Sequence, residues 1–184
     1  MFEVLFLEAK LYCYFAVHLP AIRFISAKQS MPLLSGLQLK QLAFLLTKII
    51  EMNKIEHLGI AVKNLEESNL LFEKLLGTPS YKQEFVESEG VKTSFFKNGP
   101  NKIELLEATN PDSPIAKFIE KKGEGIHHIA FEVDDIESEI KRLQQEGFIV
   151  LNDKPKKGAD NKLVAFLHPK STNSVLIELC QEIK

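Results

Sequence analysis

Two histidines and two glutamates occupy matched positions in this sequence, and their side chains can bind a metal ion. His57 and His128 lie 71 residues apart in similar runs, and Glu104 and Glu178 lie 74 residues apart between aliphatic residues. Imidazole and carboxylate groups together suit divalent Zn, Co, Ni, Mn or Fe. Four such ligands on an octahedral ion leave two positions for a substrate. A single histidine or glutamate in a strand is more often a core or edge residue, but the recurrence of all four favours a metal site.

The runs around these residues indicate an internal duplication. The segment His57-Leu-Gly-Ile-Ala-Val-Lys-Asn-Leu65 aligns with His128-Ile-Ala-Phe-Glu-Val-Asp-Asp-Ile136, and Lys102-Ile-Glu-Leu-Leu106 aligns with Leu176-Ile-Glu-Leu-Cys180. Each first run alternates as a strand does and then enters a helical pattern, and further strand-like runs occupy 93–96 and 163–167. The sequence therefore predicts an α+β fold of two tandem βαβββ modules, at about residues 55–107 and 126–181, which form one curved mixed sheet around the metal site.

Helix-capping residues predict one helix in each module and one between them. Polar side chains precede the helical patterns, and a glycine follows each of them. The first helix is bounded by Asn64 and Gly77, and the second by Asp134 and Gly147. The linking helix has Ser113 as its cap. The apolar stripes expected to face the sheet are Leu65, Phe72, Leu75 and Leu76 in one module, and Ile136, Ile140 and Leu143 in the other.

Strand alternation places the four candidate ligands on one face of the sheet. In each of their strands, the ligand alternates with aliphatic residues that must pack against the helices. Gly59 and Ala61 share the face of His57, and these small residues leave space in front of the sheet. His127 falls on the packed face, so it is not equivalent to its neighbour His128. If the modules join edge to edge, their pseudo-twofold symmetry brings all four ligands into one cavity.

Several longer runs after residue 52 occur in order and with ordinary spacing. They are Ile55-Glu-His-Leu-Gly-Ile-Ala-Val, Lys102-Ile-Glu-Leu-Leu, Asp112-Ser-Pro-Ile-Ala-Lys-Phe, Gly123-Glu-Gly-Ile-His-His-Ile-Ala-Phe-Glu-Val-Asp-Asp-Ile, and Phe166-Leu-His-Pro-Lys-Ser with Val175-Leu-Ile-Glu-Leu. These runs resemble the methylmalonyl-CoA epimerase family of the vicinal oxygen chelate, or glyoxalase-like, superfamily. Members of that superfamily share paired βαβββ modules.

The resemblance implies an isomerase that interconverts the epimers of methylmalonyl-CoA at C2 through a metal-stabilised enolate. It assigns one divalent metal per chain to His57, Glu104, His128 and Glu178, with Co²⁺ as the preferred ion and Mn²⁺, Ni²⁺, Zn²⁺ or Mg²⁺ as alternatives. C2 lies between a thioester and a carboxylate, so the metal can chelate both oxygens and hold the charge that develops. One base removes the proton from one face, and an acid returns a proton to the opposite face.

Two glutamates transfer these protons in the family. One is the ligand Glu178. The other lies two residues before the glycine of a Glu-x-Gly-Val run, and Ser88 occupies that position here. A serine hydroxyl without a histidine partner is a poor general base, but a bulge could bring a flanking acid into reach. We expect Glu89 to be the second base, with Glu87 or a water-mediated route as alternatives; a solvated acidic loop is the structural explanation for the same run.

The CoA phosphates require cationic or amide donors. The second module is rich in lysine, at Lys154, Lys156, Lys157, Lys162 and Lys170. We assign Lys157, Lys170 and Ser171 to a CoA phosphate or to the substrate carboxylate, although such a charge run is also typical of a solvated surface. His168 precedes a proline in the same turn, and we expect it to be structural.

Composition limits the partners and the compartment. The net charge of −2 excludes a generally basic surface and argues against nucleic acid as a partner. Cys13 and Cys180 cannot form a disulfide framework, which is consistent with a reducing compartment. We expect a cytoplasmic protein that does not bind a membrane, and the resemblance implies a homodimer.

The first 51 residues differ in character from the rest. Their longest uncharged run, Leu11 to Ile22, is too short to span a membrane, and the segment fits neither a secretory signal nor a transit peptide. The run that begins at Met52 reads like the start of a protein. We expect residues 1–51 to be an N-terminal extension outside the fold, produced by upstream translation or dispensable, with a peripheral amphipathic anchor as the alternative. Residues 52–184 are then the vicinal oxygen chelate domain.

Two other functions remain open from the residues. A glyoxalase-type lyase would use a similar four-ligand site on a glutathione hemithioacetal, although its family-specific runs are absent here. A metal-free small-molecule binding module would normally lack the four ligands. Metal content distinguishes the binding module, and substrate assays distinguish the two enzymes.

Overall fold

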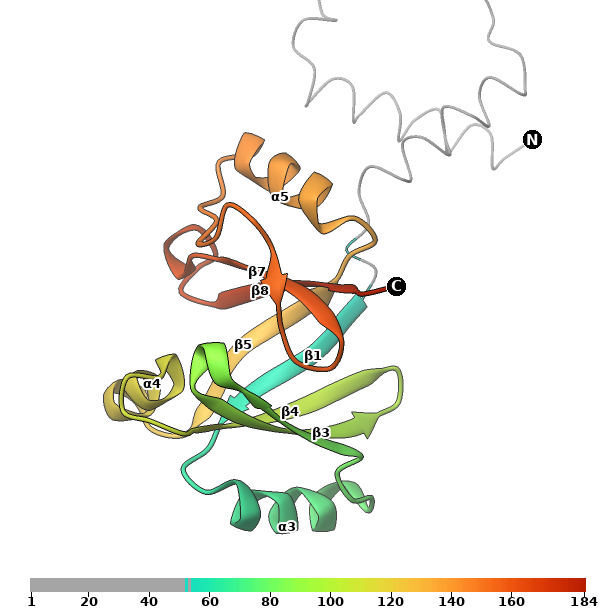
Figure 1. Ribbon diagram of the computed structural model, residues 1–184, viewed down its shortest axis with the longest axis vertical. Coiled ribbons are helices and arrows are strands. Elements are labelled where there is room, and N and C mark those ends of the chain that lie inside the picture. Colours follow the sequence, from blue (N-terminus) through green and yellow to red (C-terminus); the bar gives the residue numbers. More distant parts are fainter. Residues whose placement is uncertain (1–51, 53) are drawn as a thin grey trace, which may run out of the picture. The chain divides into compact units, whose positions relative to one another are not determined.

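An eight-stranded mixed sheet forms the framework of the protein (Figure 1). The computed structural model describes Met52 and residues 54–184, so the expected extension, residues 1–51, lies outside the described residues. The strands lie in the order β2-β3-β4-β1-β5-β8-β7-β6. Their bounds are β1 Lys54–Ala61, β2 Lys82–Val86, β3 Val91–Asn98, β4 Asn101–Ala108, β5 Gly125–Glu132, β6 Lys156–Lys157, β7 Lys162–Leu167 and β8 Leu176–Glu182.

The two modules repeat one order of elements, which confirms the duplication predicted from the sequence. The first contains β1, α3 (Leu65–Leu76) and β2–β4, and the second contains β5, α5 (Ile136–Gln145) and β6–β8. In each module the first strand runs parallel to the last, and β1 joins β5 as an antiparallel pair. Figure 1 shows β1 and β5 side by side where the two modules meet. A pseudo-twofold relation between these strands therefore relates the two halves of the sheet.

For two of the three helices, the N-cap is the residue that the sequence predicted. Asn64 Oδ1 accepts hydrogen bonds from the first turn of α3, and Ser113 caps the linking helix α4 (Pro114–Lys122). The predicted cap Asp134 is wrong by one residue. Asp135 caps α5, because its Oδ1 accepts from Ser138 N at 3.0 Å and its backbone is still extended. Among the described residues, no helix is long and apolar enough to cross a membrane.

Helix α3 covers the first module through most of the predicted stripe. Leu65 is buried with Val62 and Leu105, and Phe72 and Leu76 pack against this cluster. The prediction that Leu75 faces the sheet is wrong, since it is 71% exposed. At about 100° per residue, Leu75 lies roughly 80° from the line through the buried positions, which places it on the solvent side.

Helix α5 covers the second module as predicted. Ile136, Ile140 and Leu143 are buried with Val133 and Leu179. Met52 is partly buried and packs against the same cluster, so the chain already contributes to the core just before β1 begins. Helices α3 and α5 thus cover one face of the sheet. The candidate ligands lie on the other face, where Ile115 of α4 packs with Ala61 and Leu106.

Candidate metal centre and active site

The four predicted ligands converge from four strands. His57 Nε2 lies 2.9 Å from His128 Nε2 and 3.2 Å from Glu104 Oε2. His128 Nε2 lies 3.5 Å from Glu104 Oε2 and 3.4 Å from Glu178 Oε2. All four side chains are buried. Ligand atoms at right angles on an ion with bonds of about 2.1 Å are roughly 3 Å apart, so these separations are those of neighbouring ligands on a cation. The donor atoms of His57, His128 and Glu178 all lie within 4.8 Å of one another, and Glu104 adjoins this group through the two histidines.

Strand pairing explains this convergence. Gly59 on β1 pairs with Glu104 on β4 and with His128 on β5. The equivalent residue of the second module, Ala130, pairs with Glu178 on β8 and with His57 on β1. Each small residue therefore lies between two ligands, and the pseudo-twofold relation turns two such sets toward each other.

Two β-bulges modify the predicted alternation. The register between β1 and β5 shifts at Glu56 and again at His127, so neither residue has an opposite partner. The prediction that His127 lies on the packed face of the sheet is corrected by this bulge. The ring of His127 meets Phe118 of α4 edge-on, with centroids 5.0 Å apart, and its Nδ1 lies 3.0 Å from His128 Nδ1. Burial lowers the pKa of His127 to about 4, so its ring is neutral at pH 7.

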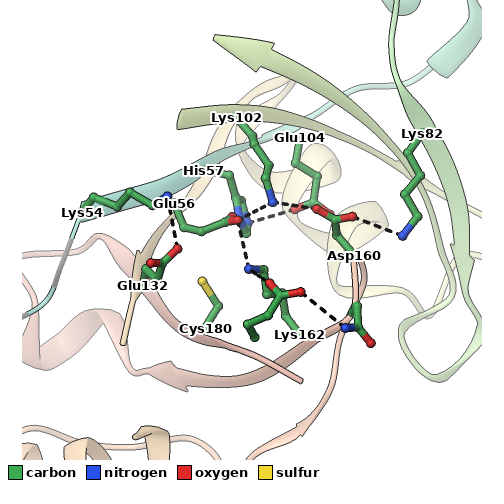
Figure 2. Close-up of polar contacts among 12 residues, drawn as sticks. Lys54, Glu56, His57, Lys82, Lys102, Glu104, Glu132, Asp160, Lys162 and Cys180 are labelled. Atoms are coloured by element: carbon green, nitrogen blue, oxygen red, sulfur yellow. Dashed lines mark hydrogen bonds and ion pairs between the residues drawn. The ribbon is translucent and has the colours of Figure 1, made fainter. Parts of the chain in front are cut away.

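Glu56 is a site residue that the sequence did not identify. Its Oε2 lies 2.6 Å from His57 Nδ1, and its side chain is almost fully buried. Lys102 donates to Glu56 Oε1, and Lys162 Nζ lies 3.5 Å from the same oxygen (Figure 2). The 71-residue offset that pairs the candidate histidines also pairs Glu56 with His127, but it gives neither residue a role.

Asp160 extends this network to the loop before β7. Lys102 Nζ donates to Asp160 Oδ2 at 2.6 Å, and Figure 2 shows the lysine between Glu56 and Asp160. Lys82 Nζ and the Tyr81 hydroxyl also donate to Asp160, at 3.2 and 3.0 Å. Because Asp160 belongs to the second module and its donors to the first, this ion cluster ties the two modules together beside the candidate metal centre.

The charges of the cluster are those of a cation site. Burial opposes ionisation of Glu104, but both histidines approach it and hold its pKa at about 2. Burial raises the pKa of Glu178, which has one histidine neighbour within 4 Å. Burial disfavours the charged form of His57, but Glu104 and Glu56 raise its pKa to about 10. A divalent cation would satisfy the same carboxylates in place of this proton.

A second donor group, Glu56, His57 and Cys180, also lies close together. Cys180 Sγ donates to Phe131 O at 3.4 Å, and burial raises the pKa of the thiol. A thiol that keeps its proton is a poor metal ligand. The structure therefore favours the histidine and glutamate set, whose donors are an imidazole and a carboxylate from each module.

The centre opens into a cleft with about 720 Å³ of space, a volume that includes its solvent-filled mouth. Its walls come from both modules and are largely apolar, with Val91, Phe95 and Leu106 on one side and Val164 and Phe166 on the other. All four ligands contribute to the lining.

The structure separates the two acidic candidates for the second base. The 3-10 turn η2 (Glu87–Glu89) contains both of them and Ser88, and of these three residues Glu89 alone lines the cavity. Its carboxylate forms an ion pair with Lys156 of β6. Glu89 therefore faces the cavity, whereas Glu87 and Ser88 do not contribute to the lining.

The residues assigned to the CoA phosphates lie in two places. Lys157 lines the cavity beside Gly158. Lys170 and Ser171 lie in the turn η3 (Pro169–Ser171), outside the lining, where Ser171 Oγ accepts from Ile149 N at 3.1 Å. His168 Nδ1 accepts from Lys170 N at 3.0 Å, which fits the structural role expected for this histidine.

Comparisons with known proteins agree with this geometry. Residues 56–166 match the family model described as Glyoxalase/Bleomycin resistance protein/Dioxygenase superfamily. The chain is 42% identical to the mitochondrial methylmalonyl-CoA epimerase of Dictyostelium discoideum, over 71% of the chain and 79% of that protein. It is 40% identical to the ethylmalonyl-CoA/methylmalonyl-CoA epimerase of Cereibacter sphaeroides, over 71% of the chain and 98% of that protein. A variant of the Streptomyces coelicolor methylmalonyl-CoA epimerase, solved with 2-nitronate-propionyl-CoA, superposes with a TM-score of 0.70 at 33% identity, covering 72% of this chain and 96% of that one.

Proposed function

We propose that this chain, which belongs to the Glyoxalase/Bleomycin resistance protein/Dioxygenase superfamily, is an isomerase that interconverts the two epimers of methylmalonyl-CoA at C2. The observation that carries the proposal is the convergence of His57, Glu104, His128 and Glu178 in one cavity of a chain that is similar to such epimerases. The 2-nitronate-propionyl-CoA in the Streptomyces coelicolor structure supports a CoA thioester as the substrate class.

The four converging side chains are the proposed ligands of one divalent metal, with Co²⁺ as the first choice and Mn²⁺, Ni²⁺, Zn²⁺ or Mg²⁺ as alternatives. A bound cation would supply positive charge to the two substrate oxygens that flank C2. The ligand residues orient those oxygens by fixing where this charge lies. The apolar walls strengthen the interaction, because charges attract more strongly away from water.

Glu178 and Glu89 are the proposed proton-transfer groups. Glu178 projects from β8 of the second module, and Glu89 lies in η2 of the first. Both line the cavity, so an acyl group bound between the modules has one carboxylate from each. One takes the C2 proton from its side, and the other returns a proton on its own side, which inverts the configuration.

Lys157, Lys170 and Ser171 are the proposed contacts of the CoA phosphates or of the substrate carboxylate. Lys157 lines the cavity, which supports this role. Lys170 and Ser171 require a ligand that extends beyond the cavity, which a CoA thioester does. The cytoplasmic location and the homodimer remain predictions from the sequence.

Hydrogen–deuterium exchange at C2 tests the proposal directly. The protein, freed of metal and reloaded with Co²⁺, is mixed with methylmalonyl-CoA in D₂O, and exchange and epimerisation are followed by NMR. Deuterium should enter C2 with the reloaded protein and not with the metal-free protein. Absence of exchange, with turnover of the glutathione–methylglyoxal hemithioacetal, would instead identify a glyoxalase-type lyase. Absence of bound metal and of both activities would indicate a binding module.

A further inference from the structure

The buried carboxylate of Glu56 faces Nδ1 of His57, the ring nitrogen that is directed away from the other proposed ligands. We infer that Glu56 is the positioning residue that presents His57 to the metal. This inference rests on the proposed metal site. His57 Nδ1 lies 2.6 Å from Glu56 Oε2, while Nε2 points into the ligand cluster, 3.2 Å from Glu104 Oε2. A carboxylate only accepts hydrogen bonds, so the neutral ring carries its proton on Nδ1 and keeps the lone pair of Nε2 for the cation.

The bulge in β1 makes this contact. Adjacent residues of a regular strand point to opposite faces, which would separate Glu56 from His57. The register shift between Ile55 and His57 removes this separation. Glu56 and His57 are consequently both buried, with exposed fractions of 3% and 5%, and their side chains meet.

Two lysines hold the carboxylate in place. Lys102 donates to Glu56 Oε1, the oxygen that does not face His57, and Lys162 Nζ lies 3.5 Å from the same atom. One oxygen of Glu56 therefore meets cations, and the other meets the histidine (Figure 2). Lys102 is itself bound to Asp160, so the orientation of the ligand depends on an ion network that spans both modules.

The second module offers no replacement for Glu56. The equivalent residue is His127, whose Nδ1 lies 3.0 Å from Nδ1 of His128. The two proposed ligand histidines thus differ in the group that faces their Nδ1 atoms. For His57 this group is the carboxylate of Glu56, and for His128 it is the imidazole of His127. Loss of Glu56 should leave His57 with no acceptor that fixes its tautomer.

The isosteric variant Glu56→Gln tests this role through metal affinity. The amide oxygen should turn to Lys102 and Lys162, which leaves the amide NH₂ facing Nδ1 and favours the tautomer that cannot bind metal through Nε2. We expect the Co²⁺ dissociation constant, measured by competition with a chromophoric chelator, to rise roughly 10- to 100-fold. The control is Glu132→Gln, which removes a carboxylate that is paired with Lys54 and does not line the cavity, and it should change the constant less than twofold. A Co²⁺ constant within twofold of wild type in folded Glu56→Gln would overturn the inference.

Two further measurements separate positioning from a purely structural role. Melting of the variant in chelator reports the stability of the fold alone; a lower melting temperature with normal Co²⁺ affinity would also overturn the inference. The wild-type protein loaded with Zn²⁺ gives the tautomer by ¹⁵N–¹H NMR of the imidazoles, which needs no variant. A proton on His57 Nδ1 is expected, and a proton on Nε2 would contradict the assignment.

The results that would overturn the role of Glu56 differ from the results that would overturn the proposed epimerase function. Epimerisation with normal metal binding by Glu56→Gln would preserve the function and remove Glu56 from it. Tight metal binding by the wild-type protein without epimerisation would overturn the proposed function and leave the role of Glu56 intact. Epimerisation by a wild-type protein that binds no divalent cation would overturn the role of Glu56.

A second inference comes from an unpartnered hydroxyl. Thr93 is 1% exposed, lies on β3 and lines the cavity, and its Oγ1 has no hydrogen-bond partner within the described part of the chain. Buried polar atoms are rarely left unpaired unless a ligand or water completes them. We propose that Thr93 Oγ1 binds an oxygen of the acyl group, which rests on the proposed function.

Ser94 provides a matched control for Thr93. Its hydroxyl is equally buried and unpartnered, but Ser94 follows Thr93 on the strand and does not line the cavity. Thr93→Val should raise the melting temperature by about 2–4 °C, because it removes an unsatisfied group without a change of shape. It should also weaken binding of methylmalonyl-CoA, measured by calorimetry, roughly 3- to 10-fold. Ser94→Ala should leave that affinity unchanged. Equal affinities in wild type and Thr93→Val, or no binding of this thioester by wild type, would overturn the second inference.

Discussion

Gly59 lies directly against the ring of His128. A β-carbon built on Gly59 would be 2.2 Å from His128 Cε1 and 2.5 Å from Nε2, whereas real β-carbons essentially never come within 3.0 Å of another heavy atom. The glycine therefore makes the space that the ring of His128, a proposed ligand, occupies. The equivalent position in the other module is Ala130, which shows that the two halves of the site are not interchangeable.

Gly59→Ala should disturb the metal centre more than the fold. The methyl group must displace the imidazole of His128, because the backbone of β1 is paired on both sides and cannot move away. We expect Co²⁺ affinity to fall at least tenfold, because the displaced imidazole of His128 would lose its orientation toward the ion. Calorimetric titration with Co²⁺ measures this, and circular dichroism confirms the fold. Normal affinity would mean that the ring can shift and still bind.

The adjacent histidines should respond differently to truncation. His128→Ala removes a ligand and should abolish metal binding and turnover. His127→Ala removes a ring that packs edge-on against Phe118 and should mainly cost stability, by about 0.5–1.5 kcal/mol for an aromatic pair. Metal analysis after gel filtration and urea unfolding measure the two effects. Retention of metal by His128→Ala, together with its loss in His127→Ala, would contradict the assignment of the ligands.

Substitution of the two proposed bases separates metal binding from proton transfer. Glu89→Gln should keep the metal and lower turnover by 100-fold or more, at the low end of the range for general acid–base catalysis, about 10²–10⁴-fold. Glu178→Gln should lower both metal affinity and C2 exchange, because this residue has two roles. Glu87→Gln is the control, since Glu87 shares η2 with Glu89 but does not line the cavity. Loss of turnover in Glu87→Gln with normal turnover in Glu89→Gln would transfer the role to Glu87.

The bond between Asp160 and Lys102 should make stability depend on pH. Burial opposes ionisation of Asp160, but Lys102 and Lys82 lower its pKa below the ordinary value. A carboxylate whose pKa is lower in the folded state stabilises the fold above its unfolded pKa of about 3.9, and this contribution disappears as pH falls through the folded pKa. Asp160→Asn should therefore cost roughly 1–2 kcal/mol at pH 7 and progressively less below pH 4.

Urea unfolding of wild type and Asp160→Asn at pH 7, 5 and 3 measures this dependence. Asp153→Asn is the control, because Asp153 is an exposed aspartate of the same loop region. It should change the free energy of unfolding little at any of these pH values. A difference between wild type and Asp160→Asn that stayed constant down to pH 3 would show that charge is not its cause.

The sequence was sufficient to predict the duplication because the periodic features repeat. Strand alternation and the 71-residue offset place His57 and His128 at equivalent positions, and the structure brings them within 2.9 Å of each other. Helix caps were less certain, since Asp134 and Asp135 have the same side chain. Which one caps α5 depends on where β5 ends, and that is decided by its pairing with neighbouring strands rather than by local residue types.

The parts of the site that were missed depend on contacts between distant strands. A bulge is a property of two paired strands, so alternation along β1 alone gave no reason to place Glu56 beside His57. Lys102 was recognised as part of a strand, but its partner Asp160 lies 58 residues further along the chain in a loop. Buried charge networks of this kind can be predicted only when the register of the sheet is known.

A shortened chain that begins at Met52 should fold, bind one metal per chain and keep full epimerase activity. All four ligands and the family match, residues 56–166, lie after this point. Met52 packs against the cluster of Val133 and Ile136, so a start at this residue preserves the contact. The free energy of unfolding, the metal content and the C2 exchange rate of the shortened and full-length chains should agree. The variant Met52→Ala in the full-length chain is the control; it should lower stability by about 1–2 kcal/mol through lost apolar burial and leave activity unchanged. A shortened chain that melts much lower than the full-length protein, or that loses activity, would show that residues 1–51 belong to the fold.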